Sequence, residues 1–174
     1  MLVRWLIPVG VGAASVAQVA HATQYLTVEQ AQRAAFPDAT AFETVRAKFD
    51  ASALGVPTGW APRVWQARAG ERVLGTFFAD AVIGKSEAID YSLALDANGA
   101  VIALEVLQYR ESHGSEVRMA PWRKQFLGKT ARDPVALNQD IKNISGATLS
   151  CRHLTEGVNR LLKVYARTAF NAPA

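Results

Sequence analysis

Hydroxyl side chains crowd one short stretch near the C-terminal end of the chain, S-G-A-T-L-S-C-R-H, residues 145–153. A single serine or threonine is enough to cap a helix, yet three of them precede an amphipathic helical pattern here: Ser145, Thr148 and Ser150. The N-terminus of a helix carries free N–H groups and a positive partial charge, which together stabilise a phosphate. Gly146 and Ala147 leave room for a ligand near the backbone. The residues alone leave two interpretations open, a phosphate-binding helix start and a capped helix without chemistry.

The same stretch contains the only cysteine of the chain, Cys151, followed two residues later by His153. Two residues at this spacing on a helix point about 200° away from each other, so they cannot share a proton as a catalytic dyad. Cys151 is therefore expected to be a small packing residue or a partly exposed thiol. A single cysteine also excludes an internal disulfide, zinc sites built on cysteine pairs and c-type haem attachment.

A second polar stretch, R-E-S-H-G-S-E-V, contains Glu111, His113 and Gly114 directly after a predicted strand. It is interpreted either as a polar loop, with the glycine supplying a turn, or as a ligand contact at a sheet edge. Further along, Trp122 and Phe126 are four residues apart on a predicted short helix, which favours core contacts over chemistry.

The elements that must position these residues include a β-hairpin over residues 88–111. Apolar residues alternate with more polar ones on both sides of Asn98-Gly99, a strong turn signal because both residues tolerate positive φ. The alternating residues are Ile89, Tyr91, Leu93 and Leu95 on the first strand and Ile102, Leu104 and Val106 on the second.

Helical signals surround this hairpin. A capping box at residues 27–30 starts a helix that is predicted to end at Phe36, before Pro37. Further helices are expected over 120–126, ended by Gly128, and over 150–167, where an apolar stripe has helical spacing. Strands are expected at 63–67 and 73–78, and residues 79–84 could continue the second strand. Residues 39–49 are ambiguous between helix and strand. Loops are expected at 54–62 and 133–144. The sum is an α+β domain, an antiparallel sheet with a hairpin core flanked by helices and a long C-terminal helix.

The first 22 residues have the three-part layout of a secretory signal. A single positive charge at Arg4 is followed by an apolar stretch, and Ala20 and Ala22 offer the small side chains that a signal peptidase accepts. An uncleaved anchor and a buried helix are the alternatives. Cleavage after Ala22 would leave 152 of the 174 residues as a single domain, 23–174.

Composition excludes several classes of protein. The chain is 50% hydrophobic and 20% charged, which suits a globular domain. Its net charge of +4, or +3 without Arg4, comes with no block of lysine and arginine, so a nucleic-acid partner is not expected. Three scattered histidines do not suggest a metal cluster.

The segment D-I-K-N-I-S-G-A-T-L-S, residues 140–150, resembles the flavinylation motif of the FMN-binding domain family. This family includes the flavin-carrying periplasmic subunits of sodium-pumping NADH:quinone reductases and of Rnf complexes. The resemblance implies FMN attached through its phosphate to the last hydroxyl of the motif, here Ser150, where threonine is more common. A separate flavin transferase makes this bond from FAD with Mg²⁺ and releases AMP.

The hairpin, the loop at 111–118 and the following helix also resemble this family, most closely its small stand-alone exported members, over about residues 87–164. The resemblance implies an exported electron carrier, without catalytic or metal-binding residues of its own, between membrane or periplasmic redox proteins that hold haem or flavin. The cofactor-binding residues that we derive from the motif and the sheet-edge loop are Asp140, Ser145, Gly146, Ala147, Thr148, Leu149, Ser150, Glu111, His113 and Gly114. Two other functions remain open, an exported module that binds a phosphate-containing ligand noncovalently and a structural subunit of a membrane redox complex.

Overall fold

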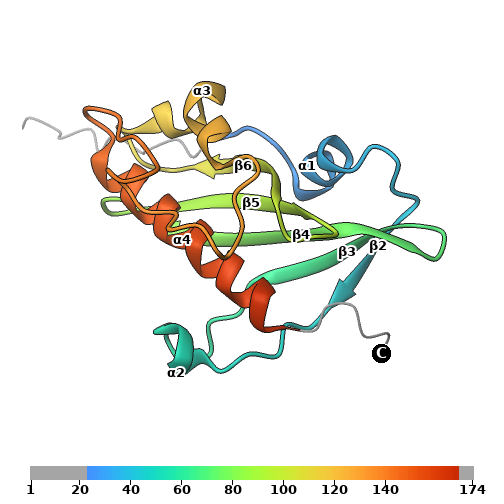
Figure 1. Cartoon of the computed structure of the whole chain (residues 1–174). Coiled ribbons are helices and arrows are strands. Elements are labelled where there is room, and N and C mark those ends of the chain that lie inside the picture. The colour runs from blue at the N-terminus through green and yellow to red at the C-terminus, as the bar shows by residue number, and fades with distance from the viewer. Residues whose placement is uncertain (1–22, 169–174) are drawn as a thin grey trace, which may run out of the picture.

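A six-stranded antiparallel sheet forms the centre of the protein, whose structure, a computed structural model, describes residues 23–168 (Figure 1). Along the sheet the strands follow the order β1-β6-β5-β4-β3-β2. Their bounds are β1 Thr23–Gln24, β2 Ala41–Val45, β3 Arg63–Ala69, β4 Arg72–Ile83, β5 Ala88–Asp96 and β6 Val101–Tyr109. The helices are α1 Val28–Ala35, α2 Ala51–Leu54, α3 Ala120–Arg123 and α4 Thr148–Arg167, with short 3₁₀ turns η1 Ser115–Arg118 and η2 Lys124–Phe126. The predicted α+β class is confirmed.

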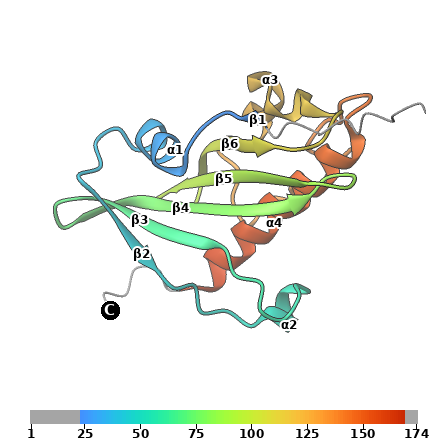
Figure 2. The same cartoon turned by 180° about the vertical axis from the view of Figure 1, so that it is seen from behind.

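Helices cover both faces of the sheet. Helix α4 runs diagonally across one face, and Figure 2 shows α1 on the opposite face. The α4 side contains the larger apolar core, in which Leu154, Val158 and Leu161 of α4 are fully buried with strand residues such as Ile89 and Leu93. The smaller core under α1 consists of Ala31, Phe36, Ala67, Phe77, Ala79, Ala94 and Leu107. The central strands are buried on both faces. Apolar and polar residues therefore alternate less strictly along them than in a sheet with one solvent-exposed face.

The β5–β6 hairpin forms where the sequence predicts it, with one correction on the return strand. Gly99 takes a positive φ of 83°, and the Asp96 carboxylate accepts the N–H groups of Asn98 and Ala100 at 2.8 and 2.9 Å. The register shifts at Ala94/Leu95, so that Val101 is buried and Ile102 is 39% exposed. The expected alternation therefore holds from Leu104 onward, because a bulge near the turn rotates the preceding residue outward.

The helix predictions hold with small shifts. Thr27 and Gln30 form the predicted capping box, and α1 ends at Ala35 with Phe36 as its C-cap. The ambiguous segment 39–49 contains strand β2, and α2, capped by Asp50, was not expected. The helix expected over 120–126 is split into α3 and η2, and the last helix begins at Thr148, two residues before the predicted start.

The structure describes neither end of the chain. The expected signal peptide, residues 1–22, lies outside the described residues, as do residues 169–174. Between residues 23 and 168, no helix combines the length and the apolar character needed to cross a membrane.

A buried carboxylate ties the middle of α4 to the sheet and to the loop before β3. The side chain of Asp80 on β4 is 7% exposed, and its carboxylate accepts hydrogen bonds from the Tyr91 hydroxyl at 3.0 Å and the Trp60 indole at 3.1 Å. Arg160 of α4 forms an ion pair with the same carboxylate at 3.0 Å and lies over the Trp60 ring, 4.6 Å from its centroid. One side chain therefore satisfies polar groups from three separate elements.

We predict that Asp80→Ala lowers the free energy of unfolding by about 3–5 kcal/mol, because it leaves the buried tyrosine hydroxyl and the arginine without their partner. Urea unfolding followed by circular dichroism measures this loss. The matched control is Glu43→Ala, which removes a more exposed ion pair with Arg68 at 3.6 Å and should cost less than about 1 kcal/mol. Equal losses in the two variants would show that the Asp80 cluster does not hold the fold together.

Candidate functional site

A cavity of about 320 Å³ lies at the N-terminal end of α4. Three segments line it: residues 85–86 between β4 and β5, residues 111–114 after β6, and residues 146–150 at the start of α4. The structure therefore brings together the two polar stretches that the sequence analysis identified separately. Of the predicted site residues, it places Glu111, His113, Gly114, Gly146, Ala147, Thr148, Leu149 and Ser150 around this cavity.

The backbone at the start of α4 is free of side-chain caps. Ala147 is the N-cap residue and makes no side-chain capping bond, and the first helical bond runs from the Cys151 N–H to the Ala147 carbonyl at 2.9 Å. The N–H groups of the preceding residues in this turn therefore have no carbonyl acceptor within the helix. Gly146, just before this turn, has a φ of 87°, in the left-handed region that glycine adopts without steric cost. A glycine is therefore needed here for the backbone conformation. None of the three hydroxyls acts as the helix cap.

Ser150 is a buried residue in the lining of the cavity. The residue is 4% exposed, and its Oγ lies 2.9 Å from the hydroxyl oxygen of Tyr109, the last residue of β6. That tyrosine hydroxyl also donates to the backbone carbonyl of His113 at 2.5 Å. The hydroxyl of Ser150 is thus joined by hydrogen bonds to the loop that forms the facing wall.

The other two hydroxyls of the motif have different surroundings. Thr148 is half-buried, and its Oγ1 accepts a hydrogen bond from the Asn143 side-chain amide at 3.0 Å. Ser145 is exposed and does not line the cavity. Of the three, only Ser150 combines burial with a position on the cavity wall.

Glu111 holds the β4–β5 turn against the end of β6. Its carboxylate accepts the N–H groups of Ser86 at 2.5 Å and Glu87 at 2.8 Å. Burial acts to raise the pKa of the Glu111 carboxyl, but these backbone bonds outweigh it and the pKa lies below its usual range. His153 fixes the same turn from α4, because its Nδ1 lies 2.9 Å from the Gly84 carbonyl oxygen.

Lys85 lies on this turn and lines the cavity, although sequence reasoning did not select it. It is exposed and adds a positive charge to the lining of the cavity that also contains the start of α4. Nothing in the sequence near Lys85 indicates this position, because the turn is held at the site by tertiary contacts with Glu111 and His153.

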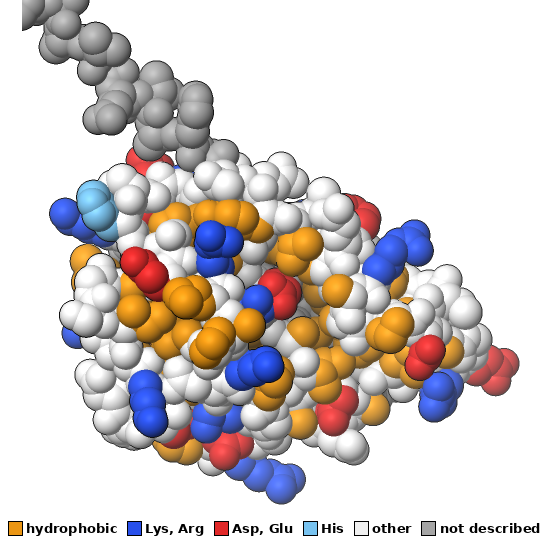
Figure 3. Space-filling model, turned by 90° about the horizontal axis from the view of Figure 1, so that it is seen from above, with side chains coloured by type: hydrophobic (Ala, Val, Ile, Leu, Met, Phe, Trp, Pro, Cys, Tyr) orange, Lys and Arg blue, Asp and Glu red, His pale blue; other side chains and the backbone are white. Residues whose placement is uncertain are grey.

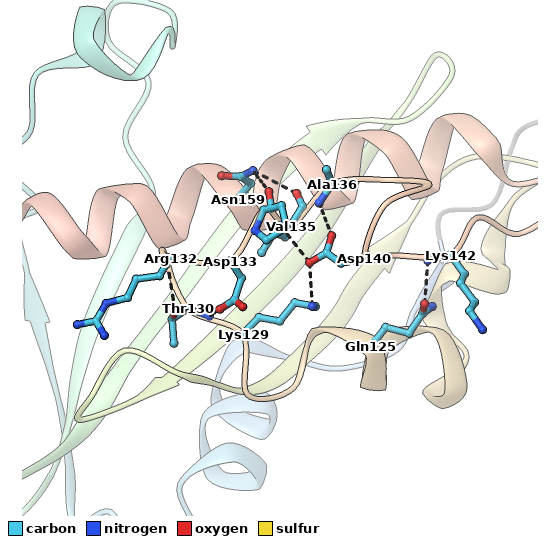
Figure 4. Close-up of polar contacts among 11 residues, drawn as sticks. Gln125, Lys129, Thr130, Arg132, Asp133, Val135, Ala136, Asp140, Lys142 and Asn159 are labelled. Carbon is cyan, nitrogen blue, oxygen red and sulfur yellow. Dashed lines mark hydrogen bonds and ion pairs between the residues drawn. The ribbon is translucent and has the colours of Figure 1, made fainter.

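Asp140 organises the loop before α4 and does not line the cavity. Figure 4 shows its carboxylate among Lys129, Val135 and Ala136: the Lys129 ammonium lies at 2.8 Å, and the two backbone N–H groups at 3.2 and 2.7 Å. Val135 is buried with a φ of 38°, a left-handed conformation that is costly for a β-branched residue. Asp140 therefore stabilises a strained loop that leads into the hydroxyl-rich motif.

The thiol and the nearby imidazole do not form a catalytic pair. Cys151 is fully buried in the core, where burial raises the pKa of its thiol, and His153 contacts a backbone carbonyl on the β4–β5 turn. His113 is exposed at the rim, and its Nδ1 lies 3.0 Å from the Ser112 hydroxyl oxygen. Within residues 23–168 there is no group of three or more histidine, cysteine and acidic side chains placed to hold a metal ion.

A second, more apolar hollow of about 500 Å³ lies beside α3. Met119, Trp122 and Ile144 are among its lining residues, and Met119 is 54% exposed. Figure 3 views the molecule from the side on which α3 lies in Figure 1 and shows hydrophobic side chains gathered on that face. Trp122 and Phe126 are buried with their ring centroids 5.1 Å apart, as expected for core residues.

Comparison with known proteins agrees with the resemblance drawn from the motif. The model of the FMN-binding domain family matches residues 84–163, which contain all three segments of the cavity. The chain is similar to a subunit of the ion-translocating oxidoreductase complex of Stutzerimonas stutzeri, with 30% identity over 115 residues, 60% of this chain and 50% of that protein. It is also similar to a subunit of the Na(+)-translocating ferredoxin:NAD(+) oxidoreductase complex of Acetobacterium woodii, with 25% identity over 80 residues, 41% of this chain and 39% of that protein. The chain thus spans half or less of the length of these two relatives.

We predict that the backbone amides of Ser86 and Glu87 report the ionisation of Glu111. Because the folded pKa of this carboxyl is lowered, its bonds to the turn are present at neutral pH and are lost as the pH falls through a value below 4.5. Amide chemical shifts measured by NMR during an acid titration should show this transition in the wild type. In Glu111→Gln the transition should be missing from both amides; an unchanged transition would assign it to another carboxyl group.

Proposed function

We propose, from the match of residues 84–163 to the FMN-binding domain family, that this chain is an exported electron carrier with FMN joined through its phosphate to Ser150. The isoalloxazine of bound FMN supplies the electron-transfer chemistry. The residues of the chain hold the phosphate, orient the flavin and set the charge around it. The domain needs no substrate pocket of its own for this function.

The surroundings of Ser150 fit a flavin phosphate. The free N–H groups at the start of α4 and the positive end of its helix dipole stabilise an anion, and Lys85 adds a cation at the cavity wall. The nearby Glu111 carboxylate is already occupied by two backbone N–H groups, which offset its negative charge locally. The single observation that carries the proposal is the buried Ser150 hydroxyl at a phosphate-compatible helix start inside a segment that matches an FMN-binding family.

The loop at 111–114 supports a place for the flavin ring next to the phosphate. We propose that the isoalloxazine lies against this loop, where the exposed His113 and the backbone of Gly114 face the rim of the cavity. Glu111 then acts indirectly, by fixing the β4–β5 turn and with it Lys85. Asp140 shapes the loop that presents the motif and is not required to contact the flavin.

Both relatives are named as subunits of oxidoreductase complexes that translocate ions. By this similarity, we propose that the present chain exchanges electrons with membrane or periplasmic redox proteins that hold haem or flavin. We propose further that a flavin transferase installs the cofactor from FAD with Mg²⁺. Covalent attachment suits a protein outside the cytoplasm, where a lost flavin is not easily replaced.

Co-expression with a flavin transferase should raise the intact mass of the chain by FMN less one water, and Ser150→Ala should abolish this gain. Ser150→Thr should retain it, because the bond needs only a hydroxyl at this position. Intact-mass spectrometry with peptide mapping measures both results, and absorbance of the denatured protein confirms that the flavin is covalent.

Two further variants are the controls for this experiment. Thr148→Ala should weaken modification without moving it, and Cys151→Ala should leave the flavin content unchanged because the thiol is buried in the core. Flavin mapped to Thr148 or Ser145 would contradict the register of the motif. Flavin that is released on denaturation of the wild type would favour a noncovalent binding module, and a wild type that never binds flavin would favour a structural subunit.

We also predict that the exported protein begins at Thr23. Residues 1–22 have the layout of a cleaved signal, and Thr23 pairs with Tyr109 as the first residue of strand β1. N-terminal sequencing of periplasmic material should therefore read Thr-Gln-Tyr-Leu. A sequence that starts at Met1 would replace the cleaved form with an anchored one.

A further inference from the structure

We infer that Tyr109 is a positioning residue that orients the Ser150 hydroxyl for flavin attachment and so selects it over Thr148. This inference rests on the proposed function, because it concerns the same bond between the chain and the flavin phosphate. It concerns a residue outside the hydroxyl-rich motif, at the end of β6, 41 positions away in the sequence.

The hydrogen bonds around Tyr109 have a defined direction. A tyrosine hydroxyl has one hydrogen, and here that hydrogen is donated to the His113 carbonyl, with the oxygen atoms 2.5 Å apart. The Ser150 hydroxyl, 2.9 Å from the Tyr109 oxygen, must therefore be the donor in the bond between the two side chains. The serine hydrogen points toward Tyr109, which leaves the lone pairs of Oγ free to face the cavity.

The chain of hydrogen bonds ends at a backbone carbonyl, which cannot take up a proton. Tyr109 therefore has no route by which to carry the serine proton away, and its role is to hold Oγ in one rotamer. Burial raises the pKa of the Tyr109 phenol, which keeps it protonated at neutral pH. Both residues are nearly buried, 3% exposed for Tyr109 and 4% for Ser150, so water competes little for this bond.

Gly114 completes the arrangement because it allows the loop to pass close to both oxygens. A Cβ atom at this position would lie 2.8 Å from the Ser150 Oγ and 2.8 Å from the Tyr109 hydroxyl oxygen. The φ of Gly114, 88°, also lies in the region that side chains rarely adopt. The close approach of this loop brings the His113 carbonyl to Tyr109 and fixes the direction of the whole chain of bonds.

Thr148 lacks an equivalent arrangement. Its hydroxyl oxygen accepts a hydrogen bond from Asn143, so one of its lone pairs is occupied and its hydrogen is not directed by a buried acceptor. Two hydroxyls that are two residues apart on the same helix turn therefore differ in orientation. This difference provides a physical reason for attachment at one of them.

The bond-forming step that Tyr109 prepares is a phosphoryl transfer without oxidation or reduction. The Ser150 oxygen bonds to the flavin-side phosphorus of FAD, the P–O bond to the AMP half breaks, and the serine O–H bond is lost. The products are the serine–FMN phosphodiester, AMP and one proton, which passes to a base on the transferase or to solvent. A fixed Oγ lone pair raises the rate of this step by holding the reacting atoms in an attack geometry.

The test measures flavin attachment to the full chain in a single turnover, with purified flavin transferase, FAD and Mg²⁺, for the wild type and Tyr109→Phe. At saturating chain concentration the rate at Ser150 should fall about fivefold to tenfold in the variant, the effect of losing one orienting hydrogen bond. The chain concentration that gives half the maximal rate should not change, because recognition of the motif is intact. Peptide mapping should place the flavin on Ser150 and not on Thr148 in both proteins.

Tyr91→Phe is the matched control. It removes the hydroxyl of another buried tyrosine, one that contacts Asp80 and does not line the cavity. It should therefore leave the rate at Ser150 unchanged, even though it affects stability. Circular dichroism of each variant under the assay conditions gives its folded fraction, which separates a loss of orientation from a loss of folded protein.

Each outcome decides between the two proposals. Equal rates at Ser150 for the wild type and Tyr109→Phe, or an equal fall in Tyr91→Phe, would overturn the role of Tyr109 and leave the proposed function intact. A rise in the half-saturating concentration with an unchanged maximal rate would also overturn it, because it would indicate a role in recognition. A wild type that gains no flavin would overturn both proposals.

Discussion

The packing of α4 across the sheet is the constraint on which the rest of the site depends. The apolar stripe of this helix, including Leu154, Val158 and Leu161, is fully buried with residues of β5 and β6, and the Asp80–Arg160 pair fixes its middle. Once the stripe is in place, the direction of the helix determines where its N-terminus lies. That end meets the loop after β6 and the β4–β5 turn, so the cavity is a consequence of the core.

The polar contacts at this end of α4 each hold a different segment of the site in place. Glu111 and His153 hold the β4–β5 turn, Asp140 holds the strained loop before α4, and Tyr109 joins Ser150 to the facing wall. Each carboxylate is satisfied by backbone N–H groups or by a cation, so neither leaves an uncompensated negative charge near the helix start. The contacts of the chain itself hold the site in this arrangement, which would lower the cost of binding the proposed phosphate.

The sequence predicted the elements well because their signals are local. The capping box at Thr27, the Asn98-Gly99 turn and the apolar spacing of α4 each depend on residues within one or two turns of each other. The exposure of Ile102 and the short helix α2 were missed, since a bulge and a four-residue helix leave little trace in a pattern. The hydroxyl-rich motif and the loop at 111–114 were identified separately. Their meeting, the part played by Lys85, and the contact between Tyr109 and Ser150 depend on tertiary packing that no local pattern encodes.

The central claim is that a phosphodiester joins FMN to Ser150, and ³¹P NMR tests it most directly. A phosphomonoester such as that of free FMN loses its second proton with a pKa of about 6, whereas a phosphodiester has no second proton to lose. The flavin-loaded chain, denatured and freed of unbound flavin, should therefore show a ³¹P resonance that does not move between about pH 5 and pH 8. A resonance that titrates across this range, or one that is lost with the unbound flavin, would contradict the account.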